Sequence, residues 1–238
     1  LLLEAPPAAA GTVTFGAVAL TPRLRRVIAA SSAMRRTASI AVSPSERACP
    51  MNPARHLVLV GPMGAGKTSI GRCLARHFGL AFADSDHEIE RHTGAAIPTI
   101  FECEGEAGFR ARERDALATL LEGPPVVLAT GGGAVLDPGN RRLLAANGFV
   151  VHLHADVPAQ LERLARDRSR PLLASGDREA TLRRLATERD PLYAEVADLA
   201  FDTRRLPAAE AARLLAQQLE PLWHRAAGTE PAQPEPAA

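Results

Sequence analysis

The chain has 238 residues, of which 46% are hydrophobic, and it carries a formal net charge of +1. This length can bury the core of one α/β domain with extra tails, or of two small domains. The near-zero net charge does not favour a nucleic-acid partner. The apolar stretch 11–20 is too short to span a membrane, so we expect no membrane partner either.

The three cysteines, Cys49, Cys73 and Cys103, are odd in number and far apart in the chain. They indicate neither a disulfide framework nor a C-x-x-C metal site, which favours a reducing compartment. We therefore expect a cytoplasmic protein, or an organellar one only if the first fifty residues are a real transit peptide.

Residues 1–50 differ from the rest of the chain. They hold six arginines against two acids, whereas the remaining chain holds 22 basic and 25 acidic residues. They are rich in Ala, Pro and Ser without sustained periodicity, so we expect a disordered leader. Three interpretations stay open: translation upstream of a true start at Met51 or Met34, a transit peptide, or a genuine disordered arm.

The first motif after Met51 is Gly-Pro-Met-Gly-Ala-Gly-Lys-Thr at 61–68, which fits the phosphate-binding P-loop pattern G-x-x-x-x-G-K-[ST]. The apolar run 56–60 predicts a buried strand before it. Ile70, Leu74 and Phe78 predict a helix after it. In this setting, backbone N–H groups and the helix N-terminus bind phosphate oxygens.

Two side chains of this motif predict a nucleotide and magnesium site. Lys67 would reach the β- and γ-phosphates, and the Thr68 hydroxyl would ligate Mg²⁺. Lys67 is the only lysine of the chain, which supports a need for a compact point charge there. The predicted nucleotide-binding residues of the loop are Gly64, Ala65, Gly66, Lys67, Thr68 and Ser69.

Strands and helices alternate along the chain, which predicts a parallel sheet with helices on both faces and ligands at the carboxyl ends of the strands. Pro191 is expected to break a helix, the charged segment 167–178 to be a mobile loop, and the tail 224–238 to be disordered. The domain is expected to span 51–223. The predicted strands are 56–60, 80–83, 126–129, 149–153 and 199–201. The predicted helices are 67–78, 88–92, 98–103, 106–121, 138–147, a segment from about 158, 179–188, and a last helix from Pro207 to near Trp223.

Two carboxylates stand at the carboxyl end of the second predicted strand. Asp84 and Asp86 point to the same side if the strand persists, so beside a P-loop they indicate one ligand for Mg²⁺ and one for a hydroxyl substrate. Alternatively, Asp86 only caps the next helix. The third strand is followed by three glycines, 131–133, instead of an acid, which leaves Asp84 as the metal carboxylate. The glycines let backbone approach a ligand, or form a plain turn.

Three arginines stand out by their context. Arg110, Arg170 and Arg189 are candidates for bidentate clamps on a carboxylate substrate. His152 and His154 alternate along the fourth strand and would share a face. Without a third ligand nearby, we interpret them as satisfied polar residues rather than as a metal site.

Taken together, the motifs resemble the shikimate kinase family over about 53–223, and the leader and tail are not part of the pattern. They occur in the family's order: the P-loop at 61–68, Asp-Ser-Asp at 84–86, Gly-Glu-x-x-Phe-Arg at 105–110, Gly-Gly-Gly-Ala-Val at 131–135, Arg-Pro-Leu-Leu at 170–173 and Arg-x-Pro-Leu-Tyr at 189–193.

This resemblance implies a three-layer P-loop fold of the nucleoside-monophosphate-kinase type. Its five-stranded parallel sheet would have the order 2-3-1-4-5, with helices on both faces and a mobile lid. It also implies transfer of the ATP γ-phosphoryl to the 3-hydroxyl of shikimate, giving shikimate 3-phosphate and ADP in aromatic amino-acid biosynthesis. We expect a monomer that uses Mg²⁺ and binds shikimate and ATP.

The same resemblance assigns roles to single residues. Lys67, Asp86 and Arg170 would be catalytic, with Arg170 closing from the lid onto the phosphates. Thr68 and Asp84 would serve Mg²⁺, Asp84 through water. Shikimate would be held by Asp86, Arg110, Gly132 and Arg189. Adenine would lie against Arg163, with Arg204 and Pro207 on its other side, where the spacing is one residue short of the family pattern.

Three alternatives remain at this point. Another small-molecule kinase, such as a gluconate kinase, would lack the triple glycine and the Arg-Pro-Leu-Leu segment. A non-catalytic relative that binds nucleotide would be expected to have lost the P-loop, Asp86 or an arginine. A GTPase would need an Asn-Lys-x-Asp guanine reader after the fourth strand, and Lys67 is already in the P-loop.

Overall fold

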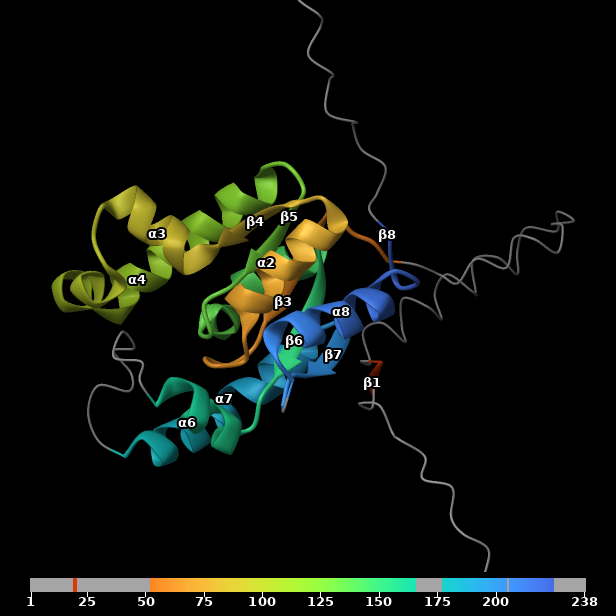
Figure 1. The fold of residues 1–238 in the computed structure, drawn as a ribbon. Coiled ribbons are helices and arrows are strands. Elements are labelled where there is room, and N and C mark those ends of the chain that lie inside the picture. The colour runs from red at the N-terminus through yellow and green to blue at the C-terminus, as the bar shows by residue number, and fades with distance from the viewer. Residues whose placement is uncertain (1–18, 21–51, 166–176, 205, 225–238) are drawn as a thin grey trace, which may run out of the picture.

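The computed structural model describes residues 19–20, 52–165, 177–204 and 206–224. At its centre lies a parallel sheet of order β4-β5-β3-β6-β7 (Figure 1). Numbered along the chain, these strands have the order 2-3-1-4-5, so the predicted fold class is confirmed. The strands are β3 (His56–Val60), β4 (Ala81–Asp84), β5 (Val126–Ala129), β6 (Gly148–His154) and β7 (Leu199–Asp202).

Three further strands are two residues long: one extends this sheet at its edge, and the other two form a separate small sheet. β1 (Ala19–Leu20) pairs antiparallel with β7 at the edge of the sheet. β2 (Asn52–Pro53) pairs parallel with β8 (Trp223–His224) in a separate ladder. A short part of the first fifty residues therefore contacts the sheet, and the domain limit at residue 51 stays a prediction.

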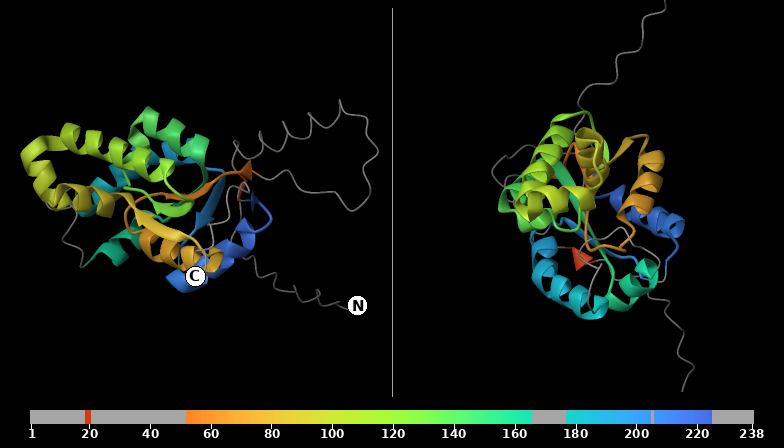
Figure 2. Two further views of the ribbon diagram at one scale, coloured as in Figure 1. Left: turned by 90° about the horizontal axis from the view of Figure 1, so that it is seen from above. Right: turned by 90° about the vertical axis from the view of Figure 1, so that its left-hand side faces the viewer.

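Helices cover both faces of the sheet (Figure 2). One face packs against α2 and α8, and the other against α4, α5, α7 and the short helix η1. None of the helices in the described ranges combines the length and the apolar character needed to cross a bilayer. Their bounds are α2 (Lys67–Phe78), α3 (Ser85–Thr93), α4 (Ile97–Glu122), η1 (Ala134–Leu136), α5 (Pro138–Asn147), α6 (Val157–Leu164), α7 (Arg178–Val196) and α8 (Ala208–Leu219).

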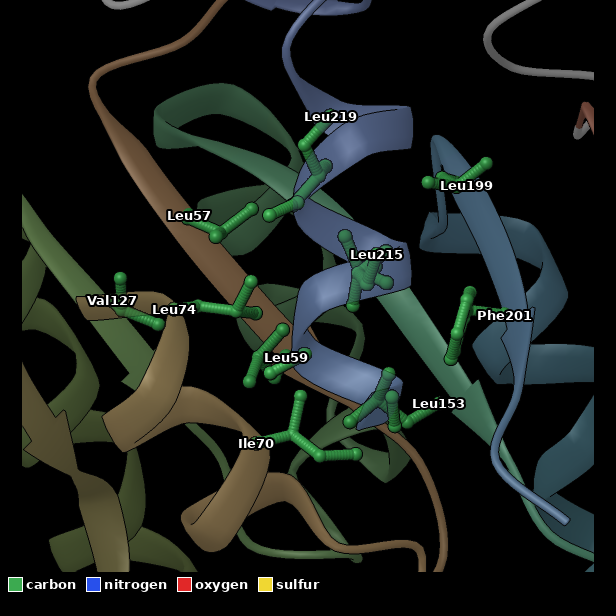
Figure 3. Packing of buried hydrophobic residues seen from close by; sticks show 14 of the residues in the cluster. Leu57, Leu59, Ile70, Leu74, Val127, Leu153, Leu199, Phe201, Leu215 and Leu219 are labelled. Carbon is green, nitrogen blue, oxygen red and sulfur yellow. The ribbon is translucent and has the colours of Figure 1, made fainter. Parts of the chain in front are cut away.

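The central strand β3 is buried on both sides, as its uninterrupted apolar run predicts. Leu57 and Leu59 face α2 and α8 together with Leu153 of β6 (Figure 3). Val58 and Val60 face the other layer. Because side chains alternate along a strand, one short run supplies both cores.

Two expectations about helices have opposite outcomes. The predicted break between 98–103 and 106–121 is confirmed as a kink in α4 at Gly105, where φ is 68°. The predicted break at Pro191 is wrong, because α7 continues through it to Val196. A proline removes a single N–H donor, and the buried side chains of Tyr193 and Val196 hold the last turns against the core.

Some boundaries differ from the predicted ones by a few residues. The helix expected at 88–92 begins already at Ser85, because the Asp84 side chain accepts a hydrogen bond from the backbone N–H of Asp86 and caps it. The helix expected at 179 begins at Arg178, where Asp177 is the capping residue. Most of the mobile loop expected at 167–178, namely 167–176, lies outside the described residues.

Candidate active site

A cavity of about 700 Å³ lies where the carboxyl ends of β3, β4 and β5 meet. In Figure 1, α3 and α4 lie on one side of this edge and α6 and α7 on the other, and all four helices contribute lining residues. This is the position that the alternation of strands and helices predicts for a ligand. The predicted site residues that line the cavity are Gly64, Gly66, Lys67, Thr68, Ser69, Asp84, Asp86, Arg110, Gly132, Arg163 and Arg189.

The P-loop connects β3 to α2 and curls around the Lys67 ammonium. Gly61 has φ of 142°, and a Cβ atom there would lie 2.3 Å from the carbonyl oxygen of Leu153. Gly66, the N-cap of α2, has φ of 90°, which a residue with a side chain rarely adopts. Lys67 Nζ donates to the carbonyl oxygens of Gly61 at 2.7 Å and Pro62 at 2.9 Å. The lysine and the first turn of α2 thus offer positive charge to a phosphate in the cavity.

Thr68 and Asp84 meet beside the loop. The Thr68 hydroxyl donates to Asp84 Oδ2 at 2.8 Å, while Asp84 Oδ1 accepts the N–H of Asp86 at 3.1 Å. Asp84, rather than Asp86, is therefore the helix cap. A hydroxyl and a carboxylate at this distance form a pair of hard oxygen donors of the kind that Mg²⁺ accepts.

Asp86 lies on the same side of the cavity as Glu113 of α4. A Cβ atom on Gly131 would lie 2.8 Å from Asp86 Oδ1 and 2.8 Å from Glu113 Oε1, so both carboxylates crowd against this glycine. Asp86 reaches the cavity from the first turn of α3, since β4 already ends at Asp84. The prediction that the strand continues to Asp86 was wrong, but both aspartates line the cavity.

Arg110 is held by two carboxylates of its own helix. Its Nη1 donates to Glu113 Oε2 at 2.7 Å and its Nη2 to Glu106 Oε1 at 3.1 Å. Burial alone would lower the pKa of Arg110, but Glu113 and Glu106 raise it above the ordinary value. The pKa of Glu113 lies above its ordinary value, because burial raises it. The nearby charge of Asp86 raises the pKa further, whereas the hydrogen bond and charge of Arg110 lower it. Arg110 therefore keeps its charge in the cavity.

The remaining cavity arginines come from α6 and α7. Arg189 is 6% exposed, and its Nε has no hydrogen-bond partner among the described residues. Arg163 donates to the carbonyl oxygen of Gly64 at 2.9 Å and to that of Thr203 at 2.6 Å. It connects the P-loop with the chain after β7.

A family model described as shikimate kinase matches residues 63–220, which is more than half of the chain. The chain belongs to the shikimate kinase family. A shikimate kinase from Stenotrophomonas maltophilia strain K279a is 59% identical over 74% of this chain and 97% of its own length. One from Xanthomonas oryzae pv. oryzae strain PXO99A is 56% identical over 73% of this chain and 96% of its own.

Solved structures agree with this assignment. The shikimate kinase from Acinetobacter baumannii in complex with shikimate is 50% identical, with a TM-score of 0.69 over 70% of this chain and 93% of that chain. The enzyme from Aquifex aeolicus is 31% identical, with a TM-score of 0.59 over 69% of this chain and 97% of that chain. As a member of the shikimate kinase family, the chain is an ATP-dependent kinase of the shikimate pathway.

Three described residues expected from the shikimate kinase pattern, Ala65, Arg204 and Pro207, are not among those that line the cavity. Ala65 is fully buried within the loop. Arg204 pairs with Asp202 and with Asp156 at 3.3 Å, and is not among the described lining residues. Arg170 falls outside the described residues. The roles expected of these residues stay predictions.

Among the residues that sequence reasoning did not assign to the shikimate kinase site are Glu113, which lines the cavity, and Ser85, which supports its wall. Glu113 is fully buried beside Arg110, and its spacing of three residues on one helix was a signal that could have found it. Ser85 is fully buried, and its hydroxyl accepts the N–H of Gly131 at 2.9 Å. No local sequence pattern predicts this hydrogen bond, because its partners are 46 positions apart in the chain.

Proposed function

We propose that this cavity transfers the γ-phosphoryl of ATP to the 3-hydroxyl of shikimate, with shikimate 3-phosphate and ADP as products. The observation that carries this proposal is the buried guanidinium of Arg189, whose Nε has no partner among the described residues. A buried cation is costly unless an anion reaches it. Glu113 and Tyr193 already interact with Arg189 inside the protein. The carboxylate of shikimate supplies a partner for the Arg189 Nε, with Arg110 as the second clamp and Gly132 contributing backbone contacts.

The P-loop side of the cavity holds ATP. Lys67 and the N–H groups of the first turn of α2 bind the phosphates, and Arg163 lies against the adenine. Thr68 and Asp84 hold Mg²⁺, because their paired oxygens suit this ion. When bound, Mg²⁺ neutralises the charge on the transferring phosphoryl group. Arg204 near the adenine and Arg170 from a lid complete this side.

Asp86 acts on the acceptor. Its carboxylate lines the cavity between the P-loop and α4. There it orients the ring hydroxyls and accepts the proton of the attacking hydroxyl. Arg110 and Arg189 fix the opposite end of the acceptor, so the reaction depends mainly on positioning.

The organisation of the protein is also part of the proposal. Residues 51–223 form the kinase domain, which acts as a monomer. Bacterial shikimate kinases that match nearly their full length support a cytoplasmic location. The free thiols of Cys73 and Cys103 are consistent with a reducing compartment.

The direct test is ADP release by the purified full chain with Mg²⁺ and ATP, with and without shikimate. We expect release that depends on shikimate and that stops when the metal is chelated. Gluconate in place of shikimate serves as the matched alternative acceptor. Equal release with both acceptors, or none with shikimate from a folded chain that binds ATP, would contradict the proposed substrate.

Replacing Arg110 by alanine should weaken acceptor binding selectively. We expect Arg110→Ala to raise the KM for shikimate by about 10- to 100-fold, the worth of one charge-assisted hydrogen bond. The KM for ATP should change less than twofold, because Arg110 lies on the α4 side of the cavity. Steady-state kinetics with each substrate varied in turn measures both constants, and an equal rise of the two would remove Arg110 from the acceptor side.

Removing residues 1–50 should leave catalysis intact. We expect the fragment 51–238 to keep kcat/KM for shikimate within about threefold of the full chain, because the family match begins at residue 63 and β2 and β8 stay present. Among the described residues, the fragment loses the two-residue pairing of β1 with β7. A larger loss, with folding verified by circular dichroism, would place the leader inside the functional domain.

A further inference from the structure

Gly132 contacts two parts of the chain that are distant from it in sequence, the P-loop and α7. The hydroxyl of Tyr193 donates to its carbonyl oxygen at 2.5 Å. A Cβ atom on Gly132 would make ordinary contacts, 3.6 Å from the carbonyl oxygen of Gly61, 3.6 Å from the N–H nitrogen of Met63 and 3.7 Å from the Tyr193 hydroxyl. Gly132 thus packs beside the P-loop, and the hydrogen bond from Tyr193 sets the orientation of its peptide at the cavity wall.

The ring of Tyr193 is held in place by the ring of His152, on which it stacks. Tyr193 lies on α7, is 1% exposed, and its ring stacks on that of His152 with the centroids 5.0 Å apart and an interplanar angle of 29°. Burial raises the pKa of the Tyr193 hydroxyl, so it stays protonated and can donate. The tyrosine thus spans from β6 to the glycine turn after β5.

His152, the other ring of this stack, is neutral. It is paired in register with Val60, the last residue before the P-loop, and its Cδ2 atom lies beside Gly61. Burial, together with His154 and Lys67, lowers the pKa of His152 to about 4, so the ring is uncharged at pH 7. Its Nε2 has no hydrogen-bond partner among the described residues. The interpretation of His152 as a satisfied polar residue was therefore wrong, and what the ring contributes is its flat face.

We infer that Tyr193 and His152 are positioning residues for the phosphoryl acceptor: the ring of His152 supports Tyr193, and the Tyr193 hydroxyl orients the peptide of Gly132 toward the acceptor. This inference rests on the proposed function, in which Gly132 contacts shikimate. It adds two residues that do not touch either substrate. It depends on the continuation of α7 past Pro191, which places Tyr193 within hydrogen-bond reach of Gly132.

The test uses the full chain and measures the KM for shikimate, the KM for ATP and the thermal unfolding temperature. Tyr193→Phe removes only the hydroxyl, and we expect the KM for shikimate to rise about 3- to 10-fold, as loss of one hydrogen bond implies. The KM for ATP should stay within twofold. His152→Ala should shift the same constant in the same direction, whereas His152→Phe, which keeps a ring beneath Tyr193, should restore it.

The matched control is Trp223→Phe. Trp223 is also buried, and its Nε1 donates to the carbonyl oxygen of Ala54 at 2.9 Å, at the opposite end of the sheet. This variant should lose stability like Tyr193→Phe but keep both KM values. If Trp223→Phe raises the KM for shikimate as much, or if Tyr193→Phe leaves it unchanged, the inference is overturned.

Failure of the inference is distinguishable from failure of the proposed function. Wild-type chain that releases ADP only with shikimate, while Tyr193→Phe keeps a normal KM for shikimate, overturns the inference alone. Wild-type chain that is inactive with shikimate overturns both. Arg110→Ala in the same assay reports whether the acceptor subsite itself lies where proposed.

Discussion

Asp86→Asn should lower kcat by about 10²- to 10⁴-fold, the usual contribution of a general base. The substitution keeps the size and most hydrogen-bonding capacity of the side chain but removes its ability to accept a proton. Because the α3 cap is formed by Asp84, the helix start should survive the change. Initial rates of ADP release at saturating shikimate and ATP measure the effect.

The control for this prediction is Asp115→Asn, an exposed carboxylate on the same helix as Arg110. It changes the net charge equally and should leave kcat within twofold. Near wild-type turnover of Asp86→Asn would remove Asp86 from the role of base and leave only an orienting role.

Gly133→Ala is expected to lower kcat/KM for shikimate by about 10- to 100-fold, as great a loss as deleting the Arg110 side chain. A Cβ atom there would lie 2.5 Å from Arg110 Nη2 and 2.6 Å from Nη1. The guanidinium is the end of a flexible side chain, so it can move aside at small cost in stability. It would then no longer reach the acceptor, and the KM for ATP should not change.

A double-mutant cycle tests this explanation. If the added methyl group acts through Arg110, then Gly133→Ala should cost almost nothing in a chain that already carries Arg110→Ala. Independent losses that simply add would show that the glycine matters for another reason, such as the conformation of the turn.

Much of the fold follows from local patterns. The P-loop strand and helix, 56–60 and 67–78, and the third strand, 126–129, have the predicted bounds because apolar runs and glycine caps mark them. The continuation of α7 past Pro191 could not be predicted, because it depends on burial of Tyr193 in a core built from distant segments.

In the candidate site, too, some features follow from local sequence patterns and others depend on the packing of distant segments. Lys67, Thr68 and the two aspartates lie in one cavity as expected, since motifs at the ends of parallel strands converge. The reason for the three glycines was only partly anticipated. Gly131 leaves space for the ends of Asp86 and Glu113, and Gly133 for the end of Arg110, which is a property of the assembled layers. A carboxylate such as Glu113 gains its importance only from this packing.

The ladder between β2 and β8 brings the two ends of the kinase domain together. Asn52 lies beside Trp223, and Pro53 beside His224, in parallel register. This junction precedes the amino end of β3, whereas the substrates enter at the carboxyl end. A circular permutation that joins the two ends through a short flexible linker, which parallel strands require, and opens the chain in a surface loop, should therefore preserve the domain. Likewise, a fusion partner at either end should leave the mouth of the cavity accessible.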